Sequence, residues 1–172
     1  DSLLITDYLG NTYLSEKISS ITATEEKKIS VKYIKNNLEV ERVFDAFVYD
    51  GKIYVSYTTN KDNCNIINVS YAEISSESLE FKNFFNPKIC NRTGSPGKMQ
   101  YIEIDQIHGL LLSTSEGISD QPGTNAQSPD SIFGKILFVP FDRSKEIKIF
   151  SSDNRVIQGL NVHNRKIVAT EH

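Results

Sequence analysis

The sequence predicts an all-β fold, and three observations carry this prediction. Helical periodicity of apolar residues is nearly absent over the 172 residues. Short runs rich in β-branched and aromatic residues alternate with turns of Gly, Asn, Asp and Ser. One hairpin pattern recurs along the chain, as three segments whose second strands begin at Lys52, Leu110 and Lys166, 58 and 56 residues apart.

The β-rich runs give an ordered series of expected strands. They are Leu3–Thr6, Thr12–Ser15, Ser20–Ala23, Ile29–Ile34, Leu38–Val43, Ala46–Tyr49, Lys52–Tyr57, Ile66–Ile74, Leu79–Phe84, Met99–Ile104, Leu110–Ser115, Lys135–Val139, Ile147–Phe150, Val156–Val162 and Lys166–Thr170. Thr24–Lys28 and Ser128–Phe133 are expected as short helical turns, the second started by Ser128-Pro129.

The recurring hairpins are FDAFVYDGKIYVSYT, QYIEIDQIHGLLLSTSE and IQGLNVHNRKIVATEH. Their expected turns are Asp50-Gly51, His108-Gly109 and Asn164-Arg165. Asp-Gly favours a type I′ turn, in which both central residues have positive φ. The repeat therefore predicts a series of similar antiparallel units.

A repeated antiparallel unit with long insertions is typical of four-stranded propeller blades, and the competing all-β architecture is a sandwich. Fifteen strands give three to four blades, whereas closed propellers typically have four to eight. An open stack would expose strand edges that invite pairing. We therefore expect residues 1–172 to form one partial β-propeller domain that continues beyond the C-terminus or is completed by another chain, such as a second copy.

The composition excludes two classes of partner. The formal net charge is −3, and Lys and Arg are scattered rather than gathered in a stripe with aromatic residues. Nucleic-acid binding requires such a basic surface. No apolar run approaches the roughly 18 residues of a membrane-spanning helix, so no membrane span is expected.

The two cysteines, Cys64 and Cys90, fall at the open end of an expected hairpin. If Ser76 and Glu77 form its turn, paired residues have numbers that add up to 153, whereas Cys64 and Cys90 add up to 154. A one-residue bulge would bring the two thiols opposite each other and allow a disulfide. The alternative is two buried free thiols in a reducing compartment.

Two tripeptides match the glycosylation sequon, with Asn68 and Asn91 as the candidate acceptors. Such tripeptides arise by chance in an Asn-rich chain and matter only in a eukaryotic protein. Together with the cysteine pair they favour an extracytoplasmic location, periplasmic or secreted.

The stretch STSEGISDQPGTNAQSPDSIFGKILFVPFD resembles the soluble sugar dehydrogenases of the glucose/sorbosone dehydrogenase family. Segments Leu111–Gly117, Asn125–Gln127 and Gly134–Leu137 follow the order of the family's motifs, with Phe138 where the family usually has Arg. Downstream, DNRVIQGLNVHNRKIVATEH is similar to two further family segments, and FDAFVYDGKIYVSYT to an early blade. The resemblance implies about half of a six-bladed propeller of a type that uses pyrroloquinoline quinone (PQQ) and calcium.

The resemblance also implies a degenerate catalytic site. The family's general base is a His, and Gly94 stands at the matching position, where no side chain can accept a proton. Lys98 replaces a family Arg. Arg155 is retained, but Val156 and Ile157 replace the Asn and Pro that follow it in the family.

The expected function is a non-catalytic binding module that holds a protein or glycan on the loop face of the propeller. The alternative is an active PQQ- and calcium-dependent aldose dehydrogenase. The candidate ligand-binding residues are Asn125, Gln127, Lys98, Arg155 and Gln158. No catalytic residue and no metal ligand is predicted.

Simpler interpretations compete at several of these positions. Arg155 at the start of a strand could simply bond a loop carbonyl, and Lys98 could be a solvated strand end. Strand tyrosines such as Tyr54 and Tyr101 are more often packing residues than a sugar platform. The absence of Trp weakens a carbohydrate-stacking site further.

Overall fold

The computed structural model describes residues 2–17, 29–62, 64–90, 97–117, 124–164 and 166–171. In these residues the chain forms fourteen strands and one short helix, which confirms the all-β prediction. The strands make three four-stranded sheets and one two-stranded hairpin. The strand expected at Ser20–Ala23 and the turn at Thr24–Lys28 lie outside the described residues.

The first sheet has the order β1 (Leu4–Thr6), β2 (Thr12–Ser15), β3 (Val31–Asn36), β7 (Ser78–Leu79). The first three strands are antiparallel, whereas β7 runs parallel to β3. Strand β7 lies in the connection between β6 and β8 of the next sheet, so it links the two sheets.

The second sheet is an antiparallel meander of β4 (Arg42–Tyr49), β5 (Lys52–Lys61), β6 (Cys64–Glu73) and β8 (Lys82–Phe85). The two strands expected at Leu38–Val43 and Ala46–Tyr49 are instead the single strand β4, with a register shift between Val43 and Asp45. The β4–β5 turn is confirmed, because Tyr49 pairs with Lys52 and both Asp50 (φ 49°) and Gly51 (φ 70°) are left-handed.

The third sheet is a second antiparallel meander, in the order β12-β11-β10-β9. Its strands are β9 (Met99–Ile104), β10 (Ile107–Ser113), β11 (Ile136–Pro140) and β12 (Lys148–Ser151). Helix α1 (Thr124–Gln127) lies between β10 and β11. Of the helical turn expected at Ser128–Phe133, the structure has one hydrogen-bonded turn, closed by the Ser131 N–H to the Ser128 carbonyl at 3.3 Å. The hairpin of β13 (Ile157–His163) and β14 (Lys166–Glu171) follows.

The turn expected at His108-Gly109 is also wrong. Ile104 pairs with Ile107, so the turn residues are Asp105 and Gln106, with φ of 51° and 65°. Gly109 is instead a buried residue of β10. A Cβ there would lie 2.6 Å from the Val139 carbonyl oxygen and 2.7 Å from the Phe138 ring, so this glycine permits close approach of β11.

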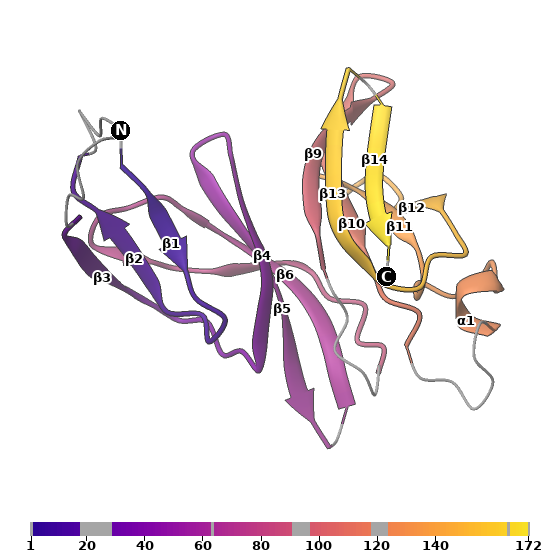
Figure 1. The fold of residues 1–172 in the computed structure, drawn as a ribbon, viewed down its shortest axis with the longest axis horizontal. Coiled ribbons are helices and arrows are strands. Elements are labelled where there is room, and N and C mark those ends of the chain that lie inside the picture. The colour runs from indigo at the N-terminus through magenta and orange to yellow at the C-terminus, as the bar shows by residue number, and fades with distance from the viewer. Residues whose placement is uncertain are drawn as a thin grey trace.

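Apolar side chains fill three layers. The first, second and third sheets follow one another along the long axis of the molecule, and the β13–β14 hairpin lies over β9 and β10 (Figure 1). Ile34, Ile53 and Leu79 pack between the first and second sheets. Tyr54, Val69, Leu110 and Leu137 are among the residues between the second and third sheets. Ile102, Leu111, Phe138 and Ile157 fill the space between the third sheet and the β13–β14 hairpin. The described residues thus form an open series of sheets.

Candidate functional site

The five residues predicted to bind a ligand lie at one end of the sheets, which we call the loop end. It is the end at which β9, β11 and β13 begin. Lys98 directly precedes β9, α1 carries Asn125 and Gln127 ahead of β11, and Arg155 and Gln158 flank the start of β13.

These residues share an end of the molecule but do not form one polar cluster. The Lys98 ammonium donates a hydrogen bond to the Phe44 carbonyl at 3.0 Å. Arg155 pairs with Glu116, with 3.8 Å between Nε and Oε2, and its side chain is 73% exposed. Gln127 and Gln158 are exposed, and no hydrogen bond or ion pair joins any two of the five residues. Their ligand-binding role therefore stays a prediction.

No histidine lies at the loop end among the described residues. Gly94, the position that the resemblance matches to a general base, and His172 lie outside the described residues. His108 in β10 and His163 in β13 lie at or beside the opposite, turn end of their strands.

Asp45 is a loop-end residue that the sequence analysis missed. Its carboxylate accepts hydrogen bonds from the Met99 N–H at 2.8 Å and from the Ala46 N–H at 3.0 Å. Burial raises the pKa of Asp45, while the Met99 amide and the Lys98 charge oppose that rise. Because both oxygens already accept backbone donors, Asp45 ties β4 to β9. A lone Asp between Phe44 and Ala46 was the only signal for it in the sequence.

Lys135 follows Gly134 and directly precedes β11. It is a buried cation rather than an exposed one. The residue is 0% exposed. Its ammonium donates to the carbonyl oxygens of Asn125 (3.2 Å), Ala126 and Phe133 (3.3 Å). Burial lowers the pKa of Lys135, and the Asp153 charge opposes this shift.

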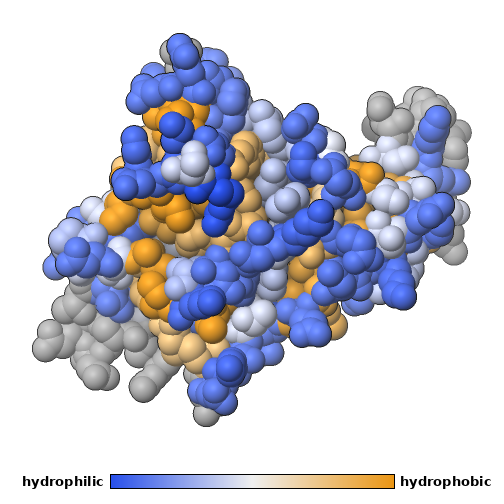
Figure 2. All heavy atoms as spheres, turned by 180° about the vertical axis from the view of Figure 1, so that it is seen from behind, coloured by the Kyte–Doolittle hydropathy of each residue, from blue (hydrophilic) through white to orange (hydrophobic). Residues whose placement is uncertain are grey.

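A groove of about 420 Å³ runs across the strands β4, β9 and β13. Its lining is mainly apolar and aromatic with an amide and a carboxylate, and consists of Phe47, Tyr49, Gln100, Tyr101, Ile102, Glu103 and Val162. Ligand sites in proteins commonly combine apolar walls with a few polar groups in this way. Figure 2 shows from behind that hydrophobic residues gather between hydrophilic ones on the half of the molecule that carries the third sheet and the β13–β14 hairpin.

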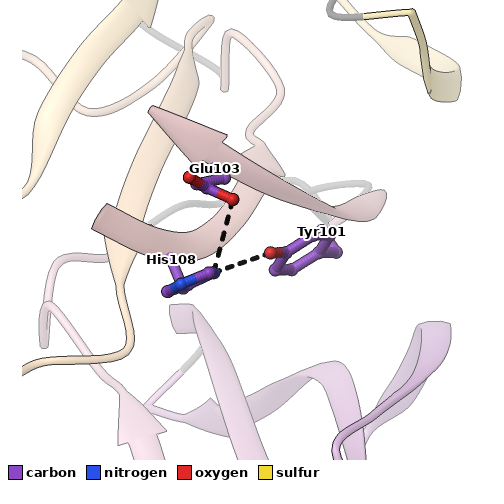
Figure 3. Close-up of polar contacts among 3 residues, drawn as sticks. All are labelled: Tyr101, Glu103 and His108. Carbon is purple, nitrogen blue, oxygen red and sulfur yellow. Dashed lines mark hydrogen bonds and ion pairs between the residues drawn. The ribbon is translucent and has the colours of Figure 1, made fainter. Parts of the chain in front are cut away.

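Tyr101, Glu103 and His108 form a polar cluster beside this groove, on the adjacent strands β9 and β10 (Figure 3). The Tyr101 hydroxyl lies 2.7 Å from Nδ1 of His108, and the same nitrogen lies 4.0 Å from a Glu103 carboxylate oxygen. A hydrogen bond with Tyr49 raises the pKa of Tyr101 to about 12, with burial a smaller cause. The phenol is therefore a neutral hydrogen-bonding group at physiological pH and unsuited to act as a base.

A second groove, of about 310 Å³, opens between the second and third sheets at the turn end of the strands. Its lining combines rings with charged and amide groups, and consists of Tyr49, Asp50, Lys52, Tyr54, Tyr71, Asn83, Phe84, Phe141 and Arg143. Tyr49 borders both grooves and stacks on Tyr101 and on Phe141, with ring centroids 4.3 and 5.1 Å apart. We call these two cavities the paired grooves.

The paired grooves were not anticipated from the sequence. Tyr49 and Tyr54 belong to the β4–β5 hairpin, whereas Phe141 follows β11 much later in the chain, so only the packing of two sheets brings Phe141 to the two tyrosines. The alternation of aromatic and polar residues in FVYDGKIY was the available signal, and it is equally typical of an ordinary half-buried strand.

The structure contains the disulfide between Cys64 and Cys90, with Cα atoms 5.2 Å apart. The one-residue bulge predicted between the hairpin turn and the cysteines is present, because Ser70 pairs with Asn83 whereas Val69 pairs with Phe85. Asn68 is 2% exposed, and its amide nitrogen donates to the Ile66 carbonyl at 2.8 Å. The folded chain therefore does not present Asn68 for glycosylation, and Asn91 lies outside the described residues.

The described part of the chain contains no group of three or more His, Cys, Asp and Glu side chains placed to hold a metal ion. None of its helices is long and apolar enough to cross a membrane. The chain matches no family model, and no curated protein matches it either.

Proposed function

We propose that the chain is a non-catalytic, extracytoplasmic binding module that holds a glycan in the paired grooves. The observation that carries this proposal is the mixed lining of those grooves, in which aromatic rings stand beside the carboxylate, amide, ammonium and guanidinium groups of Glu103, Gln100, Lys52 and Arg143. Sugar rings present apolar C–H faces and hydroxyl groups, so they complement such a lining.

The proposed scaffold is part of a six-bladed propeller like that of the glucose/sorbosone dehydrogenases. In support, the antiparallel units start at Arg42, Met99 and Ile157, which keeps the period of about 57 residues between successive units. Their first strands neighbour one another, because the first groove is lined by β4, β9 and β13 together. In a propeller these would be the innermost strands of three successive blades.

The size of the grooves favours a glycan over a protein. Volumes of about 420 and 310 Å³ suit one or two sugar rings each. A stable protein interface would instead bury about 800 Å² on each partner. The turn end is therefore proposed as the ligand site in place of the loop end. A protein ligand stays an outcome of the test.

The Cys64–Cys90 disulfide supports the proposed extracytoplasmic location, because oxidising compartments are where structural disulfides form and persist.

The runner-up is the PQQ- and calcium-dependent aldose dehydrogenase. The described loop end does not fit those groups: it lacks a metal-binding cluster, and Lys98 and Arg155 contact Phe44 and Glu116 rather than one another. We therefore derive no catalytic step through either group.

The test is binding of the labelled protein to an oligosaccharide array, with the variants Gln100→Ala and Arg143→Ala, one in each groove. A bound oligosaccharide should lose about tenfold in affinity in the groove variants, as expected for about 1.4 kcal/mol of lost hydrogen bonding. The exposed Lys145→Ala variant is the control and should bind normally.

Two results would contradict the proposal. One is an array on which no oligosaccharide distinguishes the wild-type protein from the groove variants. The other is dye-linked oxidation of an aldose after addition of PQQ and calcium, which would favour the enzyme.

A further inference from the structure

The strongest unexplained feature outside the paired grooves is the environment of Lys135. Three main-chain carbonyl oxygens converge on its ammonium, two from α1 and one from the residue two positions earlier. The residue is fully buried, and within the described part of the chain no carboxylate lies at ion-pair distance from it, although the Asp153 charge acts on it from farther away. A buried ammonium is stable only where such acceptors replace its hydration shell.

The backbone around Lys135 is built for this arrangement. Gly134 has φ +66°, and a Cβ there would lie 2.5 Å from Cβ of Ala126 and 2.6 Å from the Asn154 carbonyl oxygen. Only glycine therefore lets the strand approach α1 closely enough for the lysine to reach its carbonyl groups.

Three further backbone hydrogen bonds connect the segments around Lys135 at the loop end. The Ala126 carbonyl accepts the Asp153 N–H at 3.2 Å, the Gly134 carbonyl accepts the Asn154 N–H at 3.1 Å, and the Arg155 carbonyl accepts the Glu116 N–H at 2.8 Å. Without a cation among them, the carbonyl oxygens that converge here would repel one another, and the Asn125 carbonyl would lose its donor while Ala126 kept only the Asp153 N–H.

We propose that the carbonyl oxygens of Asn125, Ala126 and Phe133 form a built cation site whose resident ion is the ammonium group of Lys135. When this side chain is shortened, the site takes a free monovalent cation of similar size, such as methylammonium or potassium. The three ligands are neutral main-chain carbonyl oxygens, the kind of ligand that replaces the hydration shell of potassium in selective channels. Lys135 is thus the positioning residue for the loop-end surface that bears Asn125, Gln127 and Arg155.

The test is thermal unfolding of the Lys135→Ala variant at low ionic strength, with and without added cations. We expect a Tm about 5 °C below that of the wild-type protein, because the Asn125 and Phe133 carbonyls lose their donor and the Ala126 carbonyl keeps only the Asp153 N–H. Methylammonium chloride or potassium chloride should restore about half of the loss. Tetramethylammonium chloride at equal ionic strength should restore none, because it is too large and has no N–H.

Two further variants make the test specific. Lys135→Met fills the same space without charge, so it should be destabilised and should not respond to methylammonium. Lys145→Ala removes an exposed lysine and should leave Tm unchanged in every salt. Amide hydrogen exchange of residues 124–135 should increase in the two Lys135 variants and should fall again only in Lys135→Ala with methylammonium.

The proposal is overturned if Lys135→Met is as stable as the wild-type protein, or if the three cations act alike on Lys135→Ala. If Lys135→Ala does not fold at low ionic strength, its refolding becomes the measurement. Recovery with methylammonium alone or with potassium supports the site, and failure to recover in any cation overturns it. Glycan binding in the paired grooves is a separate measurement, so the two proposals can fail independently.

Discussion

Cys64, the first residue of β6, is joined by a disulfide to Cys90, five residues beyond the end of β8. The bond closes the open end of the β6–β8 pair, opposite the connection that carries β7. It therefore fixes the register of two strands that are interrupted by a bulge between Val69 and Ser70.

Removal of this disulfide should destabilise the second sheet. The cysteines are 26 residues apart, and a closed loop of that length corresponds to about 3.5 kcal/mol of unfolding free energy in the chain-entropy model. We expect the double variant Cys64→Ser/Cys90→Ser to lose this amount in urea denaturation. The wild-type protein with reductant should lose a similar amount, and an unchanged midpoint in both would contradict the role assigned to the bond.

Asp45 should contribute to stability through the two amides it accepts. Asp45→Ala leaves the Met99 N–H without its acceptor in a partly buried place, which costs about 1–3 kcal/mol. Asp45→Asn keeps one acceptor oxygen and should lose less. The measurement is urea denaturation of both variants, and equal losses would show that the hydrogen bond to β9 is not the source of the effect.

Gly109 and Gly51 should respond differently to alanine, although both are glycines of hairpin segments. Alanine at 109 meets the Val139 carbonyl at 2.6 Å, so overpacking should cost about 1–3 kcal/mol. Alanine at 51 meets nothing within 4 Å and has only the strain of φ +70°, roughly 1 kcal/mol. Thermal unfolding of the two variants side by side tests this order, which the reverse ranking would refute.

Stability should fall above pH 10 in part because of Tyr54. Burial raises the pKa of Tyr54 to about 12, with the charges of neighbouring groups as smaller causes. Between pH 10 and 12 the unfolded chain therefore loses a proton that the folded chain keeps, and the stability provided by the neutral phenol is lost as pH rises.

The matching variant is Tyr54→Phe, which lacks this titration. The difference in unfolding free energy between the wild-type protein and Tyr54→Phe should be constant from pH 7 to 9. It should then shift against the wild-type protein up to pH 12. A difference that stays constant over the whole range would show that Tyr54 ionises equally in both states.

The local fold could be predicted where it depends on residues that are adjacent in the sequence. Asp50-Gly51 combines two residues that tolerate positive φ, and the predicted turn is there. Asp105 and Gln106 adopt the same conformation without glycine, and nothing in the local sequence favours them over His108-Gly109. The position of Gly109 depends on the approach of β11, which lies almost 30 residues later in the chain.

The candidate site was harder to predict, for the same reason. The loop-end residues were chosen one by one from motifs. In the structure Lys98, Asn125 and Arg155 contact separate partners, and Gln127 and Gln158 are exposed. The paired grooves arise where aromatic residues of different sheets meet, as in the contact of Tyr54 with Phe141 at 5.3 Å between centroids. Such contacts join residues that are distant in the chain, so no regular spacing of aromatic residues in the sequence predicts them.

The parallel pairing of β7 with β3 sets an order of assembly. Lys35 pairs with Ser78, so the β3 edge of the first sheet stays unpaired until a segment 43 residues later in the chain has been synthesised. Until then β3 has an open edge that another chain could occupy. During translation, the interval between these two segments is therefore a period in which the nascent protein presents an unpaired strand edge.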